Sequence, residues 1–263
     1  MRELSAARIT EAVARLCIEA NTCLPASAEA ALRAAREAES WPAARGILED
    51  LCSNLDIARA TRLPICQDTG LVTVFLELGQ DVHISGGGLD EAVQEGVRRG
   101  YAEGYLRKSV VRDPLRRVNT GDNTPAALKL RIVPGEGVRI TVSPKGAGSE
   151  NMCRIKMLTP AEGEEGVRRF VVDTVLSAGG NPCPPTVVGV GIGGGFDTVA
   201  AIAREALLRP VGEPNADGYY AAMERELLAE INASGLGPPG PGGRATALAG
   251  HIEGRPAHIA MPP

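Results

Sequence analysis

The stretch Ser177–Ala200, SAGGNPCPPTVVGVGIGGGFDTVA, indicates a helix end, a rigid loop, a short strand and the start of another helix. Gly179 and Gly180 suit the left-handed backbone that often follows a helix. The prolines on both sides of Cys183 fix φ angles and remove backbone N–H donors, so they hold the cysteine in one orientation. A thiol that only fills space in a core does not need this rigidity. We therefore predict that Cys183 is a metal ligand.

Helical and strand patterns alternate on both sides of this stretch. Helical spacing of apolar residues covers 4–20, 27–39, 42–60, 89–106, 159–178, 197–208 and 219–232, and strand patterns cover 71–78, 126–133, 138–143, 187–192 and 245–252. We expect a mixed α/β (α+β) fold, treated as one domain over 1–263. A helical N-terminal part of about 1–60 precedes mixed sheets flanked by helices in about 61–263. The strand order does not follow from the sequence.

The composition excludes several kinds of protein. The chain of 263 residues has a net charge of −4 and scattered positive residues, so we expect no nucleic-acid surface. No apolar run reaches the ~18 to 20 residues that a membrane span needs. The first ten residues, MRELSAARIT, lack the apolar core of a signal peptide, so we expect a cytoplasmic protein with reduced thiols.

The six cysteines fall into two groups. The first lies on or beside the N-terminal helical segments, where free cysteine usually serves as a small core residue, and consists of Cys17, Cys23 and Cys52. The second adjoins loops rich in glycine, proline and polar residues, and consists of Cys66, Cys153 and Cys183. Only the second group is expected to carry chemistry.

The loop 63–70, LPICQDTG, places a thiol, an amide and a carboxylate in sequence at Cys66, Gln67 and Asp68. An Asp-Thr-Gly sequence alone is equally typical of a surface turn. The adjacent cysteine favours a functional site over a plain turn. The loop therefore predicts chemistry close to the start of the strand 71–78.

Two glycine-rich segments are candidates for binding an anion or a cofactor. Small residues in 145–153, KGAGSENMC, allow a ligand close to the backbone, whose successive N–H groups can hold an anion. This segment lacks the Lys-Ser/Thr ending of a phosphate loop, and a carboxylate fits it equally well. The cluster 191–195, GIGGG, is a weak match to a dinucleotide site, so we expect close packing of strand on helix there.

The cysteines of the second group are too far apart for a zinc ribbon or a ferredoxin pattern. Single cysteines from separate loops suit an iron–sulfur cluster between two lobes, held by three thiolates. Three ligands on a four-iron cluster leave one iron open, and an open iron can act as a Lewis acid on a substrate without redox change.

Five motifs resemble those of class I iron–sulfur hydro-lyases. They are 64–70 PICQDTG, 105–107 YLR, 119–123 NTGDN, 145–149 KGAGS and 183–185 CPP. The chain is similar over nearly its whole length to the α subunits of two-chain fumarate hydratase and L-tartrate dehydratase, and to the N-terminal domain of single-chain class I fumarases. The resemblance implies reversible hydration of a C4 dicarboxylate. Fumarate and malate are the first expected substrate pair, and conversion of L-tartrate to oxaloacetate is the second expected reaction.

The resemblance also implies a [4Fe–4S] cluster with one iron not bound by cysteine. Cys66 and Cys183 match two of its ligands. In the family the third ligand follows the His258 motif in a Val-Asn-x-x-Cys segment, whereas this sequence stops at Met261-Pro262-Pro263. We expect that the sequence is shortened. Two alternatives stay open: Cys153 serves as the third ligand, or this form of the protein lacks the cluster.

The roles implied for the remaining residues concern the substrate. Asp68 matches the residue that handles the proton of the hydroxyl group, and Gln67 lies beside the substrate. Arg107 matches a carboxylate clamp, a task that suits a bidentate guanidinium. Gly148 matches a backbone contact to the substrate, and His258 matches a polar contact near the hydroxyl group.

The resemblance further implies a partner chain. The base that removes the carbon-bound proton, and more carboxylate-binding cations, belong in the family to a second domain or β subunit, so we expect an α2β2 assembly. Two other functions remain open: a non-enzymatic iron–sulfur redox or sensing module, and a cluster-free binding protein. The particular dicarboxylate depends on pocket shape and cannot be read from the sequence.

Overall fold

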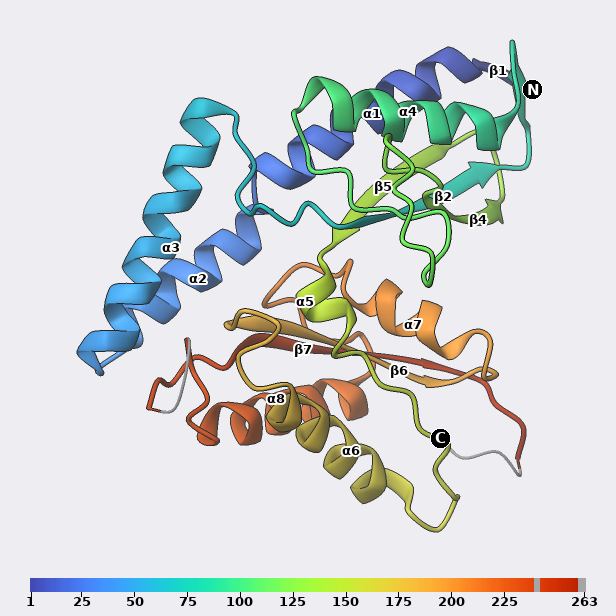
Figure 1. The fold of residues 1–263 in the computed structure, drawn as a ribbon. Coiled ribbons are helices and arrows are strands. Elements are labelled where there is room, and N and C mark those ends of the chain that lie inside the picture. Colours follow the sequence, from blue (N-terminus) through green and yellow to red (C-terminus); the bar gives the residue numbers. More distant parts are fainter. Residues whose placement is uncertain (239–241, 260–263) are drawn as a thin grey trace. The chain divides into compact units, whose positions relative to one another are not determined.

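The computed structural model describes residues 1–238 and 242–259, and the chain divides into two compact units (Figure 1). The first unit contains Met1–Leu24 and Asn54–Ala147, and the second contains Pro25–Ser53 and the described residues from Gly148 onward. Helix α3 (Pro42–Thr61) begins in the second unit and ends in the first. The chain therefore enters each unit twice. The treatment of 1–263 as one domain stays a prediction.

The first unit contains a mixed sheet with the order β4-β2-β5. The central strand β2 (Leu71–Gly79) pairs in parallel with β4 (Ala127–Val133) and antiparallel with β5 (Val138–Lys145). A second, two-stranded parallel sheet joins β1 (Arg2–Ser5) to β3 (Val82–Ser85). The mixed α/β fold that we expected is thus confirmed.

Helices α1 (Ala6–Thr22) and α4 (Leu89–Glu103) pack side by side against the sheet of the first unit (Figure 1). Small residues allow their close approach: a Cβ atom on Gly96 would lie 2.6 Å from the Cβ atom of Val13, and one on Gly100 would lie 2.8 Å from that of Cys17. Glycine therefore permits the close packing of these two helices.

The boundaries of these helices differ from the predicted ones. The predicted helix 4–20 begins at Ala6 because Leu4 belongs to β1, where it pairs with Ile84. The predicted helix 89–106 ends at Glu103. Tyr105 has a φ of 53°, a left-handed conformation that cannot continue a helix. Apolar periodicity did not distinguish these ends, because apolar residues continue beyond them.

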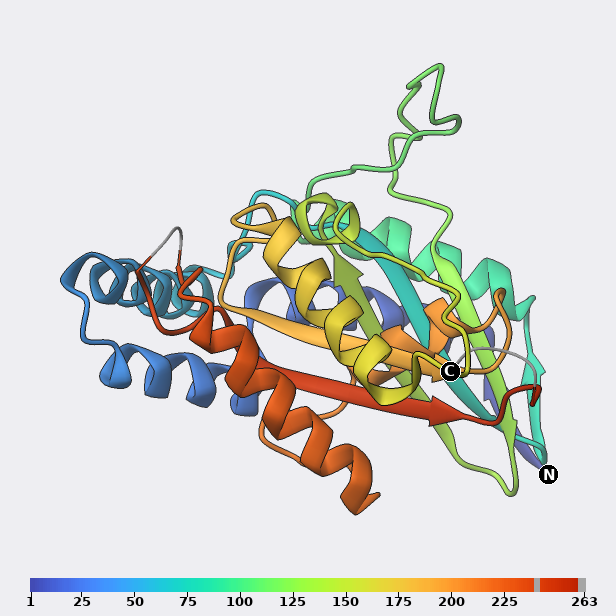
Figure 2. The same ribbon diagram turned by 90° about the horizontal axis from the view of Figure 1, so that it is seen from below.

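The second unit contains a parallel pair of strands, β6 (Thr186–Gly193) and β7 (Ala247–Arg255), with helices on both faces. Helix α7 (Val199–Ala206) covers one face, while α6 (Gly163–Ala178) and α8 (Gly218–Ala233) cover the other (Figures 1 and 2). Met223, Leu227 and Ile231 form the buried face of α8, and Leu228 is partly buried beside them.

The alternation of valine and glycine along β6 matches these two faces. Val188 and Val190 pack with the core under α6 and α8. Gly189 and Gly191 point to α7, where added Cβ atoms would lie 2.4 Å from the carbonyl oxygen of Ala203 and 2.5 Å from that of Val199. Glycine in this strand therefore permits close packing of strand on helix, as the sequence indicated.

The remaining segments of the second unit refine the predictions. Helix α2 (Ala26–Ala38) follows Pro25, and the hydroxyl oxygen of Ser27 accepts a hydrogen bond from the N–H of Val211. A short helix, α5 (Ala147–Glu150), spans the boundary of the two units within the predicted anion-binding loop. Residues 239–241, within the glycine- and proline-rich segment 235–243, and the end 260–263 lie outside the described residues. Among the described helices, none combines the length and apolar character that crossing a membrane requires.

Candidate functional site

The loop that precedes β2 is fixed at its start by bonds to two helices. The N–H of Ile65 donates to the carbonyl oxygen of Asn21, and the side-chain amide of Asn54 donates to the carbonyl oxygen of Ile65, each at 2.8 Å. The loop then presents Cys66 and Gln67 to solvent. A partly buried anchor followed by exposed polar groups suits a reactive loop rather than a flexible turn.

The side chains of this loop also bond to one another. The Cys66 thiol donates to Oε1 of Gln67 at 3.3 Å, and Sγ of Cys66 accepts from the N–H of Asp68 at 3.5 Å. The loop therefore holds a thiol, an amide and a carboxylate in one small region of the first unit.

The Asp68 carboxylate is held by backbone donors from two places. Oδ1 accepts from the N–H of Gly70 at 3.1 Å, and Oδ2 accepts from the N–H of Ala147 at 2.7 Å. A Cβ atom on Gly146 would lie only 3.1 Å from Oδ2, so glycine at this position leaves room for the carboxylate. One N–H group of the 145–153 segment thus binds the carboxylate of a side chain of the protein. Binding of a ligand anion by this segment stays a prediction.

Arg107 is exposed, and its backbone is bound to the same loop. The Thr69 hydroxyl donates to the carbonyl oxygen of Arg107 at 2.9 Å. The hydroxyl of Tyr101 donates to the carbonyl oxygen of Thr69 at 2.6 Å and to that of Gly70 at 3.2 Å. Burial raises the pKa of Tyr101, so the phenol remains a protonated donor.

Asn123 makes a second connection between the two segments. Its Oδ1 accepts from the N–H groups of Ser109 at 2.7 Å and Val110 at 3.3 Å, and its Nδ2 donates to the carbonyl oxygen of Gly70 at 3.2 Å. The side chain is completely buried. The sequence alone indicates no role for Thr69, Tyr101 or Asn123. The polar motif 119–123 drew attention to Asn123, but nothing in the motif indicated that its side chain is buried.

Cys183 lies in the second unit, exposed, in a left-handed conformation with a φ of 56°. The N–H of Cys183 donates to the carbonyl oxygen of Gly180 at 3.0 Å, which closes the turn after α6. Left-handed backbone is unfavourable for a residue with a Cβ atom, and such strain is common at functional sites. Cys183 thus lies in a strained turn, and its role as a metal ligand stays a prediction.

Gly148 and Cys153 are near the Cys183 loop in the second unit. A Cβ atom on Gly148 would lie 2.7 Å from the carbonyl oxygen of Asn181, and the amide of Asn181 also donates to the sulfur of Met152 at 3.7 Å. Cys153 is exposed, and its thiol donates to the carbonyl oxygen of Ser149 at 3.7 Å. The 148–153 segment and the Cys183 loop are thus hydrogen-bonded to each other. Together they carry Gly148, the predicted backbone contact, and Cys153 and Cys183, two of the predicted ligands.

His258 lies at the opposite end of the β6–β7 pair from Cys183. Cys183 precedes β6, whereas His258 follows β7, and the N–H of Gly194 donates to the carbonyl oxygen of Pro256 at 3.2 Å. Because the two strands are parallel and β6 has 8 residues, the strand pair separates the two ends by roughly 25 Å. The structure does not bring His258 and Cys183 together.

The donor types suit an iron–sulfur cluster, because Cys66, Cys153 and Cys183 are all exposed thiols. Cys17 and Cys52 are buried as predicted, burial raises the pKa of Cys17 to about 12, and Cys23 is only partly buried. Within 1–238 and 242–259, no three side chains of histidine, cysteine, aspartate or glutamate form a group that could hold a metal. The structure therefore supplies exposed thiols on separate loops of the two units.

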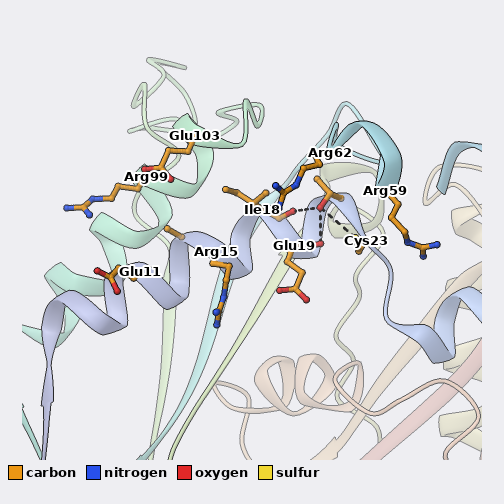
Figure 3. A pocket seen from close by; sticks show the side chains of 11 residues that line it. Glu11, Arg15, Ile18, Glu19, Cys23, Arg59, Arg62, Arg99 and Glu103 are labelled. Atoms are coloured by element: carbon orange, nitrogen blue, oxygen red, sulfur yellow. Dashed lines mark hydrogen bonds between the residues drawn. The ribbon is translucent and has the colours of Figure 1, made fainter. Parts of the chain in front are cut away.

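A pocket of about 570 Å³ in the first unit lies beside α1, α4 and the end of α3, and the residues that line it do not include the predicted site residues. It carries both arginine and glutamate side chains. The guanidinium groups of Arg15, Arg59 and Arg99 point in different directions, so they do not form a common anion site (Figure 3).

Comparison with known proteins identifies the class to which this fold and these loops belong. The family model described as fumarate hydratase (Fumerase) matches residues 10–263, and the chain belongs to this family. A protein of Methanocaldococcus jannaschii provisionally named L(+)-tartrate dehydratase subunit alpha is 41% identical over 262 residues, which cover 97% of this chain and 92% of that protein. The L(+)-tartrate dehydratase subunit alpha of Escherichia coli strain UTI89 is 32% identical over 255 residues, which cover 95% and 84%. The resemblance inferred from the motifs is thus confirmed.

Proposed function

We propose that this chain is the α-type subunit of a hydro-lyase that adds water reversibly across the double bond of a C4 dicarboxylate. The family match supports the reaction type, and the relatives named as tartrate dehydratase subunits support a hydroxylated C4 diacid. Fumarate/malate is the first substrate pair to test, and conversion of L-tartrate to oxaloacetate is the second.

The observation that carries this proposal is the fixed carboxylate of Asp68 beside the exposed thiol of Cys66. Two backbone N–H groups hold the carboxylate, and its loop presents the thiol and the amide of Gln67 at the surface. A positioned carboxylate can accept or return the proton of a substrate hydroxyl group, and proton transfer of this kind contributes roughly 10²- to 10⁴-fold to a rate. A surface turn needs no such positioning.

Cys66 and Cys183 would hold an iron–sulfur cluster, and Cys153 is the candidate third ligand among the described residues. When bound, the cluster supplies an open iron that acts as a Lewis acid on the substrate oxygens. The exposure of the three thiols and the strained backbone of Cys183 support this assignment.

The other residues bind and orient the substrate in this proposal. The guanidinium of Arg107 binds a substrate carboxylate, Gln67 bonds to the substrate beside Asp68, and the backbone of Gly148 contacts it. His258 is not assigned to this set, because the β6–β7 pair places it at the opposite end of the strands from Cys183.

The proposal includes a second chain, because the family resemblance places the base that removes the carbon-bound proton on a second domain or β subunit. The relatives are themselves named alpha subunits, which supports a β-type partner. We propose that the two chains form an α2β2 enzyme. The chain alone, with its cluster reconstituted, is therefore expected to be inactive. A normal hydratase rate from the isolated chain would contradict the need for a partner.

The decisive experiment is anaerobic purification of the chain with its partner, followed by iron and sulfide analysis and a panel of fumarate, malate, L-tartrate and methylated analogues. Asp68→Asn is expected to lower kcat about 10³-fold. Asp81→Asn, an exposed aspartate of the same unit, is the matched control and is expected to leave kcat unchanged. If Asp68→Asn and Arg107→Ala leave the function of the protein intact, a redox or sensing module replaces the hydro-lyase proposal.

A further inference from the structure

The Cys66–Gly70 loop and the Arg107–Val110 segment are connected by buried side chains. Thr69 connects them directly, since its hydroxyl donates to the carbonyl oxygen of Arg107 at 2.9 Å. Asn123 connects them a second time, by accepting from two N–H groups of the Arg107–Val110 segment while donating to the loop at Gly70. Thr69 is 2% exposed and Asn123 is 0% exposed, so both connecting side chains are shielded from water.

Asn123 is itself held in a defined orientation. Its φ is 63°, a left-handed conformation that asparagine tolerates better than most residues. The neighbouring Asp122 accepts from the N–H and the hydroxyl of Thr124, and its carboxylate bonds to Arg98 of α4 at 3.1 Å. The side chain of Asn123 is thus placed by a turn that is anchored on a helix of the core.

We propose that Thr69 and Asn123 are positioning residues that set where the Arg107 guanidinium lies relative to the Asp68 carboxylate. Neither side chain needs to touch the substrate. The hydrogen bonds of Thr69 and Asn123 fix the backbone next to Asp68 and next to Arg107. The Arg107 guanidinium, which binds a carboxylate, and the Asp68 carboxylate, which handles the hydroxyl proton, therefore keep a constant separation. This inference rests on the proposed function of Arg107 and Asp68.

The physical consequence of losing one connection follows from the burial. Thr69→Val keeps the shape of the side chain but leaves the carbonyl oxygen of Arg107 without its buried donor, so the Arg107–Val110 segment loses a fixed position. A misplacement of about 1 Å in such a segment can lower a rate about 100-fold. Thr69→Ser keeps the hydroxyl and should retain the connection.

The test compares Thr69→Val, Thr69→Ser and Thr10→Val in the complete enzyme with its partner chain. Thr10 is the matched control: it is a buried threonine of the same unit, 5% exposed, whose hydroxyl donates to the carbonyl oxygen of Ala92 at 2.9 Å, between α1 and α4. We expect Thr69→Val to lower kcat/KM about 100-fold, with KM for the dicarboxylate raised, and Thr69→Ser to restore most of it. Thr10→Val is expected to lower thermal stability without this change.

Hydrogen exchange of the backbone amides gives a readout that does not depend on turnover. Thr69→Val and Asn123→Asp are expected to increase exchange in residues 105–110, and Thr10→Val is not. Unchanged exchange there overturns the positioning role, whatever reaction the enzyme catalyses. The positioning role is also overturned if exchange increases in Thr69→Val but its kcat/KM equals that of Thr10→Val. The connection would then be only structural. Absence of dicarboxylate turnover by the wild-type enzyme instead refutes the proposed function.

Discussion

The Asp68 carboxylate accepts a hydrogen bond at 2.7 Å from the backbone N–H of Ala147, a residue 79 positions later in the chain. Asp68 precedes the central strand β2, and Ala147 follows β5, which pairs antiparallel with β2. Because antiparallel strands place the start of one beside the end of the other, the sheet itself brings the carboxylate to its donor. The position of this carboxylate is thus a consequence of strand pairing.

Gly146→Ala tests the space that this bond requires. The new Cβ atom would lie 3.1 Å from Oδ2 of Asp68, so the carboxylate must move by a few tenths of an ångström away from the N–H of Ala147. We expect kcat to fall about 10-fold or more with little change in thermal stability. Gly137→Ala is the control in the same unit, because nothing lies within 4 Å of its Cβ position. Equal activity of the two variants would show that the bond to Ala147 does not matter for turnover.

The strained backbone of Cys183 predicts that stability and ligand function oppose each other at this position. Glycine tolerates a φ of 56° without the steric penalty of a Cβ atom. We expect Cys183→Gly to be more stable than Cys183→Ala by about 1 kcal/mol in urea unfolding, while both variants lose bound iron. If the two variants unfold at the same urea concentration, the strain is absent in solution.

The exposure of the thiols predicts a pattern of alkylation. Iodoacetamide at pH 8 is expected to modify Cys66, Cys153 and Cys183 in the folded protein, and to leave Cys17 and Cys52 unmodified because they are buried. The raised pKa of Cys17, about 12, further keeps that thiol protonated. Mass spectrometry of the digested protein gives the modified positions.

Cluster assembly should change this pattern in a defined way. Anaerobic reconstitution with iron and sulfide is expected to protect Cys66 and Cys183, and a chelator that removes the iron should restore their alkylation. Protection of Cys153 would identify it as the third ligand. Unchanged alkylation of Cys66 and Cys183 after iron has bound would rule them out as ligands.

The second unit contains a buried ion pair whose effect on stability depends on pH. Arg209 bonds to both carboxylate oxygens of Glu224, at 2.6 and 3.1 Å, and the N–H groups of Ile252 and Asn215 also donate to it. Burial raises the pKa of Glu224, but these bonds outweigh burial and hold the pKa below its ordinary value of 4.5. Glu224→Gln is expected to lower the free energy of unfolding by about 3 kcal/mol at pH 7.

The pH dependence follows from the direction of this shift. A carboxyl group whose pKa is lower in the folded state stabilises the fold above its unfolded pKa, and this contribution is lost as the pH falls. The difference in Tm between wild type and Glu224→Gln should therefore shrink as the pH is lowered below about 4.5. Glu226→Gln, an exposed carboxylate of the same helix paired with Arg168, is the control and should change stability by less than about 1 kcal/mol. A constant difference in Tm from pH 7 to pH 3 would contradict this account.

The sequence alone determined most of the local structure and the family. Apolar spacing located the helices and strands within a few residues, since each repeats a local period that side-chain burial imposes. It failed at Leu4 and beyond Glu103, where strand pairing and a left-handed residue decided the boundary. The motifs around Cys66 and Cys183 identified the family because the residues of a reactive loop are contiguous in the chain.

Only the tertiary structure decided which of these groups meet. The division into two units that the chain enters twice, the donor that Ala147 provides to Asp68, and the connection of Thr69 to Arg107 join residues far apart in sequence, and no local period records such contacts. The parallel pairing of β6 and β7 likewise placed His258 at the opposite end of the strands from Cys183, although both belong to recognised motifs. A sequence pattern reports what each segment buries, whereas hydrogen bonds between segments depend on how the strands pair.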